Sequence, residues 1–406
     1  MSNFNGFQRF LWAVLRRGVE SVPENLEKKA NFAAWPQGLG TDIICNLAAS
    51  IRTSNTAIHL YGKCASTESR CLKKMKDDKL INKLPSSFVY TITTQGLEQL
   101  RLELPDWYEF YMQYSNKHRP GGNEANKVTS VRMSEVHSLM QVCKIKFGPQ
   151  KPSLENIYNG GRKNKPYDNV YYMLKELKYE KTQQEARTNT SRATGVVFAR
   201  GINALVYNAY DTPITLSKPC ERETRLHMIP FSQDLFEDGT LRTVDDAIFI
   251  AKDDKAALKI INTNKGFRMI GDAIKSKKLT GQTFRYIPLN RDGAEYLKRI
   301  TDFSEQAIIA SLFSESEIKA AKDLGVGDAV VGNLICYEFV SCNVTKIIEA
   351  FNRHKDDISK IGIIADTRQM SFIFTLFGRP QEGVKSKKLS GEEINRRLYG
   401  KEKILE

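Results

Sequence analysis

Hydroxyl and basic side chains gather between residues 66 and 83 in types and spacings that suit contact with a phosphate backbone. Arg and Lys neutralise phosphates, and Ser, Thr and Arg side chains early in a helix can hydrogen-bond to base edges. We expect the early residues to face bases and the later lysines to lie near phosphates. The predicted contact residues here are Ser66, Thr67, Ser69, Arg70, Lys73, Lys74, Lys76 and Lys83.

These side chains need a helix and a loop to position them, and the surrounding pattern supplies both. Apolar residues recur every three or four positions in residues 67–80, which predicts a helix with a basic outer side. A shorter helix is predicted at 56–63 and a break at 64–66, and the hydroxyls of Ser66 and Thr67 would cap the next helix. Residues 80–81 and 88–92 read as two strands around a tight loop. Helices at 42–50 and from Thr93 to about Leu104 complete the segment.

The run Tyr90-Thr91-Ile92-Thr93-Thr94-Gln95-Gly96, after the basic helix and Lys79-Leu80-Ile81, resembles the bacterial and plasmid winged helix-turn-helix families. The resemblance covers about 50 of 406 residues. It implies a winged helix whose second helix enters the major groove of double-stranded DNA. Two other interpretations stay open: a winged helix used only for protein contacts, and a basic helix that is simply a solvated face.

The charge of the chain is unevenly distributed. Residues 1–200 carry twelve of the fourteen net positive charges. This favours a polyanionic partner for the N-terminal half, which could be DNA, RNA or an acidic membrane, and DNA agrees with the winged helix. No apolar run is long enough to span a membrane. Seven scattered cysteines without paired spacing favour packed thiols over zinc ligands and fit a reducing cytoplasm. We therefore expect a cytoplasmic protein.

The expected fold class is α+β, with four regions. A winged-helix domain with an N-terminal helical arm occupies residues 1–120, and a helical basic connector follows at 121–190. The connector has a predicted linker at 117–126, a helix at 131–144 and a basic loop in which Arg162 and Lys163 could contact phosphates. An α/β domain with a mixed sheet is expected at 191–378, and a polar, loosely attached tail at 379–406.

Strands and helices alternate through the α/β domain, which predicts an open sheet. A hairpin is expected at 195–208, and Phe372 to Phe377 reads as a further strand. The strands are predicted at 246–251, 283–289, 332–340 and 361–365, and the helices at 221–228, 253–262, 292–301 and 343–354.

Three segments resemble the replication-relaxation proteins of plasmids and integrative elements. They are residues 172–178, residues 190–197 and Leu205-Val206-Tyr207-Asn208, and residues 286–293 are consistent with them. The resemblance implies a winged helix followed by an α/β domain in a protein of a mobile element, with a role in replication or DNA relaxation. It implies no particular catalytic residue.

Candidate catalytic groups are sparse. Five separated histidines do not form the pair that a metal-dependent tyrosine relaxase needs. A Mg²⁺-dependent nickase or nuclease is the alternative function, and its candidate carboxylates are Glu221, Asp245, Asp246 and Glu338. No nucleotide-binding glycine-lysine loop is present. We expect no cofactor, with Mg²⁺ only under the nuclease alternative, and a homodimer on double-stranded DNA. A structural hub with a vestigial winged helix is the third interpretation.

Overall fold

The computed structural model describes residues 35–85, 87–115, 124–151, 169–174, 176, 192–212, 244, 246–263, 267–270, 273–276, 283–377 and 384–400. The chain divides into a unit of residues Met1–Pro36 and a unit of residues Gln37–Glu406. Every element below lies in the second unit. It contains both helices and mixed sheets, as the expected α+β class requires.

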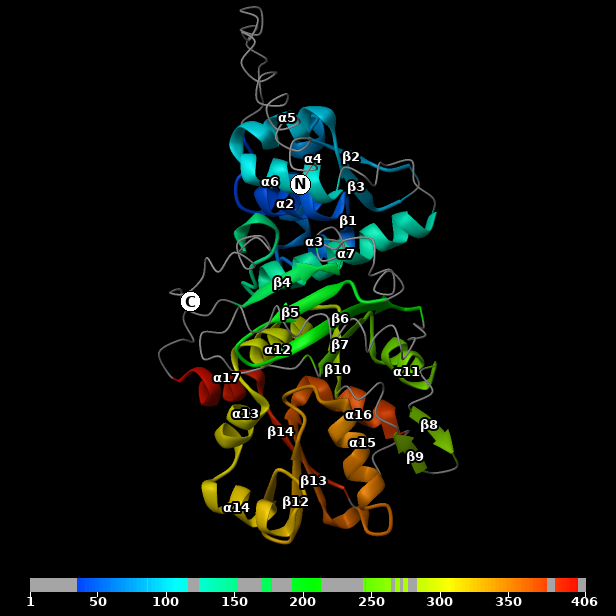
Figure 1. Ribbon diagram of the computed structural model, residues 1–406, viewed down its shortest axis with the longest axis vertical. Helices are drawn as coiled ribbons and strands as arrows, with labels where there is room; N and C mark the ends of the chain where they lie inside the picture. The colour runs from blue at the N-terminus through cyan, green and yellow to red at the C-terminus, as the bar shows by residue number, and fades with distance from the viewer. Residues whose placement is uncertain are drawn as a thin grey trace, which may run out of the picture. The chain divides into compact units, whose positions relative to one another are not determined.

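The first seven elements form a small three-stranded module, blue to cyan in Figure 1. They are α2 (Leu39–Ser50), β1 (Arg52–Ser54), α3 (Asn55–His59), α4 (Ala65–Asp77), β2 (Ile81–Lys83), β3 (Val89–Ile92) and α5 (Thr94–Glu103). Strand β3 lies between β1 and β2 and is antiparallel to both. The predicted helices and the two strands around the loop are present, whereas β1 was not predicted.

The module continues into α6 (Pro105–Phe110), the π-helical turn η2 (Tyr111–Ser115), α7 (Glu124–Val142) and the 3-10 turn η3 (Gly148–Gln150). Helix α7 begins at Glu124, so the predicted linker at 117–126 extends too far. This helix packs against α2, α3 and β1. Buried polar contacts join them: the Asn46 amide donates to the Ser134 carbonyl at 2.9 Å and to Ser138 Oγ at 2.8 Å. Helix α7 is therefore bound closely to the module.

A five-stranded sheet follows, in the order β10-β7-β6-β5-β4. Its strands are β4 (Val170–Met173), β5 (Gly195–Phe198), β6 (Asn203–Tyr210), β7 (Asp246–Ala251) and β10 (Thr283–Pro288). Strands β6, β7 and β10 are parallel, and β4 and β5 add two antiparallel strands. Strand β4 lies in the connector, where no strand was predicted. A separate hairpin pairs β8 (Phe267–Ile270) with β9 (Ala273–Ser276).

A second, four-stranded sheet has the order β11-β12-β13-β14. It is formed by β11 (Ala329–Val331), β12 (Leu334–Glu338), β13 (Ile361–Asp366) and β14 (Lys385–Leu389). The last three strands are parallel, and β11 is antiparallel to β12. The α/β region thus contains two mixed sheets where one was predicted.

Helices connect and cover the two sheets (Figure 1). They are α11 (Asp254–Thr263), α12 (Arg291–Asp302), α13 (Glu305–Leu312), α14 (Glu315–Leu324), α15 (Val344–Arg353), α16 (Met370–Phe377) and α17 (Gly391–Tyr399), with 3-10 turns η6 (Ile358–Lys360) and η7 (Thr367–Gln369). One hydrophobic core joins side chains of both sheets with α11, α15 and α16, including the stacked rings of Tyr207, Phe249 and Phe284. The two sheets therefore share a core.

Two predictions in this region are wrong. Residues 372–377 were expected to form a strand, but they lie in α16. The tail was expected to be loosely attached, but β14 is a strand of the second sheet, and Arg299 of α12 donates to Asn395 Oδ1 of α17 at 2.9 Å. The predicted helix at 221–228 lies outside the described residues.

Candidate nucleic-acid interface

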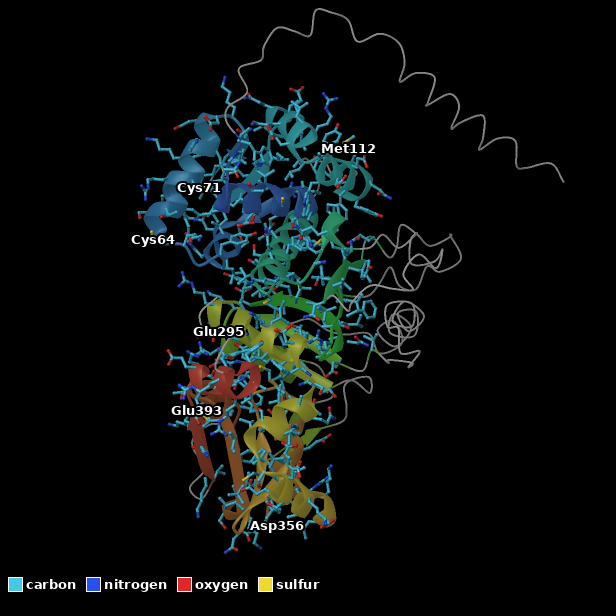
Figure 2. All side chains as sticks on the ribbon, turned by 90° about the vertical axis from the view of Figure 1, so that its left-hand side faces the viewer. Cys64, Cys71, Met112, Glu295, Asp356 and Glu393 are labelled. Atoms are coloured by element: carbon cyan, nitrogen blue, oxygen red, sulfur yellow. The ribbon has the colours of Figure 1, made fainter. Side chains whose placement is uncertain are left out.

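Helix α4 has one buried side and one basic side. Glu68, Leu72 and Met75 are buried, at the i, i+4, i+7 spacing of a single helix face. The helix lies at the border of the module, where Figure 2 labels Cys64 and Cys71, and its side chains extend outward. Of the predicted contact residues, Thr67 is half-buried, and the exposed ones are Ser66, Ser69, Arg70, Lys73, Lys74, Lys76 and, on β2, Lys83.

The buried side of α4 contains one charged residue that the sequence analysis missed. The Glu68 side chain is only 4% exposed and is hydrogen-bonded to Nδ1 of His59, which is 60% exposed. This contact fixes α3 against α4, the two helices that precede the β2–β3 loop. The spacing of Glu68 from Leu72 and Met75 is the sequence signal that could have identified it as an inward-facing residue.

The start of α4 differs from the prediction. Ser66 and Thr67 were expected to cap the helix, but it begins at Ala65, and the N-cap residue is Cys64. The Cys64 sulfur lies 3.2 Å from Ser66 Oγ and 3.0 Å from Thr67 Oγ1. These hydrogen bonds lower the pKa of the exposed Cys64 thiol to about 7. The first turn of α4 therefore presents a readily ionised thiol beside two hydroxyls.

The loop between β2 and β3 supplies the second part of the basic surface. It is closed by a hydrogen bond from the Leu84 amide to the Val89 carbonyl at 2.9 Å. The Lys83 ammonium lies 4.6 Å from the centre of the Phe88 ring, within the range of a cation–π interaction. Phe88 is 67% exposed. The ring therefore helps to position an exposed lysine at the loop.

The Tyr-x-x-Thr-x-x-Gly sequence locks α5 onto the end of α4. Thr93 Oγ1 accepts a hydrogen bond from the Gly96 amide at 2.9 Å and donates to the carbonyls of Lys79 and Leu80. A Cβ atom on Gly96 would lie 2.2 Å from the Leu80 carbonyl oxygen, which is closer than van der Waals contact allows. A glycine is therefore needed where α5 crosses the turn between α4 and β2.

Two further lysines, absent from the predicted site, extend the basic surface. Lys63 and Lys79 flank α4 at its two ends and are both exposed. A count of all basic residues from 63 to 83, and not only of those within the predicted helix face, would have included both lysines. The predicted loop residues Arg162 and Lys163 lie outside the described residues.

The described carboxylates of the nuclease alternative belong to an ion network that joins both sheets. Asp246 accepts from Arg285 at 2.7 Å, and Glu338, which is fully buried, accepts from Lys346 at 2.7 Å. Glu305 connects the two halves because it pairs with both Arg285 and Lys346. Each of the two proposed metal ligands is thus paired with a cation. Glu221 and Asp245 lie outside the described residues.

The pKa values of two carboxyl groups in this network, those of Glu305 and Asp328, are shifted in opposite directions. Burial alone would raise the pKa of Glu305, but Lys346 and Arg285 lower it to about 2. Burial raises the pKa of Asp328, a second partner of Lys346, to about 6. Within the described ranges, no three His, Cys, Asp or Glu side chains are arranged to hold a metal ion. In the same residues, no helix has both the length and the apolarity to cross a membrane.

Comparison of the chain with protein-family models, with curated proteins and with solved structures finds no match.

Proposed function

We propose that residues 39–104 form a winged helix that binds double-stranded DNA, with α4 as the recognition helix and the β2–β3 loop as the wing. The element order helix–strand–helix–helix–strand–strand–helix and the sheet order β1-β3-β2 support this arrangement. A 13-residue helix is about 20 Å long and fits the major groove.

The observation that carries the proposal is the exposure of the basic side of α4 together with Lys83. A DNA-recognition surface must be accessible to the double helix, and a helix face covered by the rest of the chain could not bind DNA. Ser66, Ser69 and Arg70, in the first turns, would meet base edges. Lys73, Lys74 and Lys83 would neutralise phosphates, and Lys76 would add to the positive field.

The resemblance to replication-relaxation proteins supports a wider role. Under this proposal the protein acts in the cytoplasm on the DNA of a plasmid or other mobile element, in replication, mobilisation or their regulation. The two-sheet region would bind a protein partner or a second copy of the chain. Binding sites for such modules commonly have two-fold symmetry, so a homodimer is proposed.

The proposal is tested by measuring binding of the full chain to fluorescently labelled random-sequence duplex at several salt concentrations. The test variant replaces Arg70, Lys73 and Lys74 with Ala. Each lost phosphate contact lowers the slope of log affinity against log salt by about 0.9. We therefore expect an affinity loss of about a hundredfold at low salt and a slope reduced by about two.

A matched control removes the same charge elsewhere. Lys319 and Lys322 on α14 and Lys355 after α15 are all exposed, and their replacement by Ala also lowers the net charge by three. This control should retain nearly all of its DNA affinity. Equal losses of DNA affinity in the two variants would show that net charge alone explains the effect. Unchanged affinity in the test variant would refute the proposed interface.

We do not extend the proposal to DNA cleavage. A two-carboxylate nuclease needs side chains free to bind Mg²⁺, and Asp246 and Glu338 are each paired with a cation. Incubation of supercoiled plasmid with the protein and Mg²⁺ separates the alternatives. Relaxed circles that disappear on replacement of either carboxylate would favour the nuclease.

A further inference from the structure

A cavity of about 940 Å³ lies beside the proposed DNA-binding module. Its walls come from β1, α3 and the β2–β3 loop on one side and from α7 and the end of β6 on the other. The residues that matter below are Arg52, Phe88, Val128, Val131, Arg132 and Glu135. The volume is within the range of pockets that bind small molecules.

Part of the cavity wall is apolar and open to solvent. Phe88 and Val128 belong to the few large apolar side chains that are exposed among the described residues, at 67% and 47%. They come from different elements, the β2–β3 loop and α7, and line the same cavity together with Val131. An apolar ligand would remove this surface from water and gain about 25 cal/mol per Å² buried.

A single buried carboxylate supplies a strong hydrogen-bond acceptor at the cavity. Glu135 of α7 is only 3% exposed. Its two oxygens accept from Asn208 Nδ2 at 2.8 Å and from Ser54 Oγ at 3.4 Å. Both donors are neutral, and burial raises the pKa of Glu135 to about 7. A cation brought next to the carboxylate would stabilise its charged form.

We propose that this cavity binds a small molecule with an apolar body and a protonated amine, with the body against Phe88 and Val128 and the amine paired with Glu135. No other acidic side chain with such burial lines the described part of the cavity; Asp211, at its edge, is exposed. The lining also contains the cationic residues Arg52 and Arg132, and Arg132, three residues before Glu135 on α7, favours the charged form of that carboxylate.

The position of Phe88 connects this cavity to the proposed DNA contact. Lys83 is the last residue of β2, and its ammonium lies over the ring of Phe88. Phe88 also lines the cavity. Ser54, a hydrogen-bond donor to Glu135, pairs with Val89 across the module's sheet. A ligand held between Glu135 and Phe88 therefore changes the position of the wing. This consequence rests on the proposed function, whereas ligand binding itself does not.

Binding is measured by isothermal titration calorimetry of the full chain at pH 8, with 4-phenylbutylamine as the probe and 4-phenylbutan-1-ol as its neutral counterpart. We expect the amine to bind at least tenfold more tightly than the alcohol. Glu135→Gln should abolish this preference and leave the affinity for the alcohol unchanged, and Phe88→Ala should weaken both. Circular dichroism would establish that each variant folds.

Absence of amine binding to the folded wild type, or equal amine affinity in the wild type and Glu135→Gln, would overturn the proposal. A second measurement separates it from the DNA proposal. The amine should shift the affinity for labelled duplex at least threefold, and amine binding without such a shift would refute the coupling to the wing. If the protein binds no DNA at all, the calorimetric result still decides whether the cavity takes the amine.

Discussion

The Arg299 guanidinium donates a hydrogen bond of 2.9 Å to the Asp366 carboxylate, and the two side chains are 1% and 0% exposed. Asp366 is the last residue of β13, Arg299 belongs to α12, and Arg368 also donates to the same carboxylate. The contact therefore ties a helix of the first sheet to a strand end of the second.

Asp366→Asn should be strongly destabilising, because it removes the nearer and fully buried one of the two carboxylates that pair with Arg299; the other, Glu295, lies 3.5 Å away and is half-exposed. Loss of one member of a buried pair costs about 3 kcal/mol. Urea denaturation measures the effect, and Asp356→Asn, at an exposed site labelled in Figure 2, is the control and should change stability by less than about 0.5 kcal/mol. Similar midpoints for the two variants would show that the buried pair contributes little.

Gly96→Ala should disrupt the junction of α4, β2 and α5. The added methyl group would meet the Leu80 carbonyl at 2.2 Å and Ile92 Cγ1 at 2.9 Å, so α5 must move. We expect a loss of about 2 kcal/mol or more, in the range of overpacked cores. Glu98→Ala, on the exposed side of the same helix, should be nearly neutral. Thermal unfolding of both variants tests this, and equal melting temperatures would contradict the tight contact.

Cys64 should be the most reactive thiol among the described cysteines. Its pKa is lowered to about 7 by the hydroxyls of Ser66 and Thr67, so about half is thiolate at neutral pH. Burial raises the pKa of Cys71. Alkylation by iodoacetamide, followed by peptide mass spectrometry, should show Cys64 modified first, with a rate that increases between pH 6 and 8. In Ser66→Ala/Thr67→Ala the pKa should rise toward the ordinary cysteine value, so alkylation at pH 7 should be slower and its midpoint should shift to higher pH; an unchanged midpoint would contradict this cause.

Glu135 should make stability depend on pH. Its pKa is raised by burial from 4.5 to about 7 in the folded chain. The unfolded chain therefore releases its proton at lower pH, and the stability contribution falls as pH rises from about 4.5 to 7 and is constant above. The charged groups around the carboxyl are Arg132 on α7 and Asp211 after β6, with Arg52 and His59 elsewhere in the cavity.

Glu135→Gln removes this titration and keeps an oxygen that can accept from Asn208. Relative to the wild type, the variant should gain stability as pH rises through that interval. Melting temperatures from pH 4 to 8 measure the difference between the two proteins. A difference that stays constant across the interval would show that the Glu135 pKa is not raised.

The spacing of apolar residues correctly predicted the helices and strands whose apolar residues all face the core. Helices α11, α12 and α15 have clear apolar faces, and β7 and β10 are short apolar runs, so all five were identified within one or two residues. The buried stripe of α4 was identified in the same way, and with it the exposed basic residues. Local spacing was sufficient in these cases because a single face meets the core.

The remaining elements depend on contacts distant in sequence. The apolar run in α16 has the composition of a buried strand, and its helical state follows from packing against α11, which local pattern does not encode. Strands β1 and β14 are polar, Arg52–Ser54 and Lys385–Leu389, and they are strands because β3 and β13 pair with them. Likewise, the partner of Glu68 is His59, which lies in another helix.

The parallel pairing of β14 with β13 bears on how the chain acquires its fold during synthesis. The N-terminal module is built from neighbouring segments and can form early, because its contacts close over short stretches of chain. The second sheet lacks its outer strand, and α12 lacks its contacts with α17, until residues 385–399 have left the ribosome. Before that moment, the backbone groups along the edge of β13 are unpaired, and this nascent intermediate is the species most exposed to association with other chains.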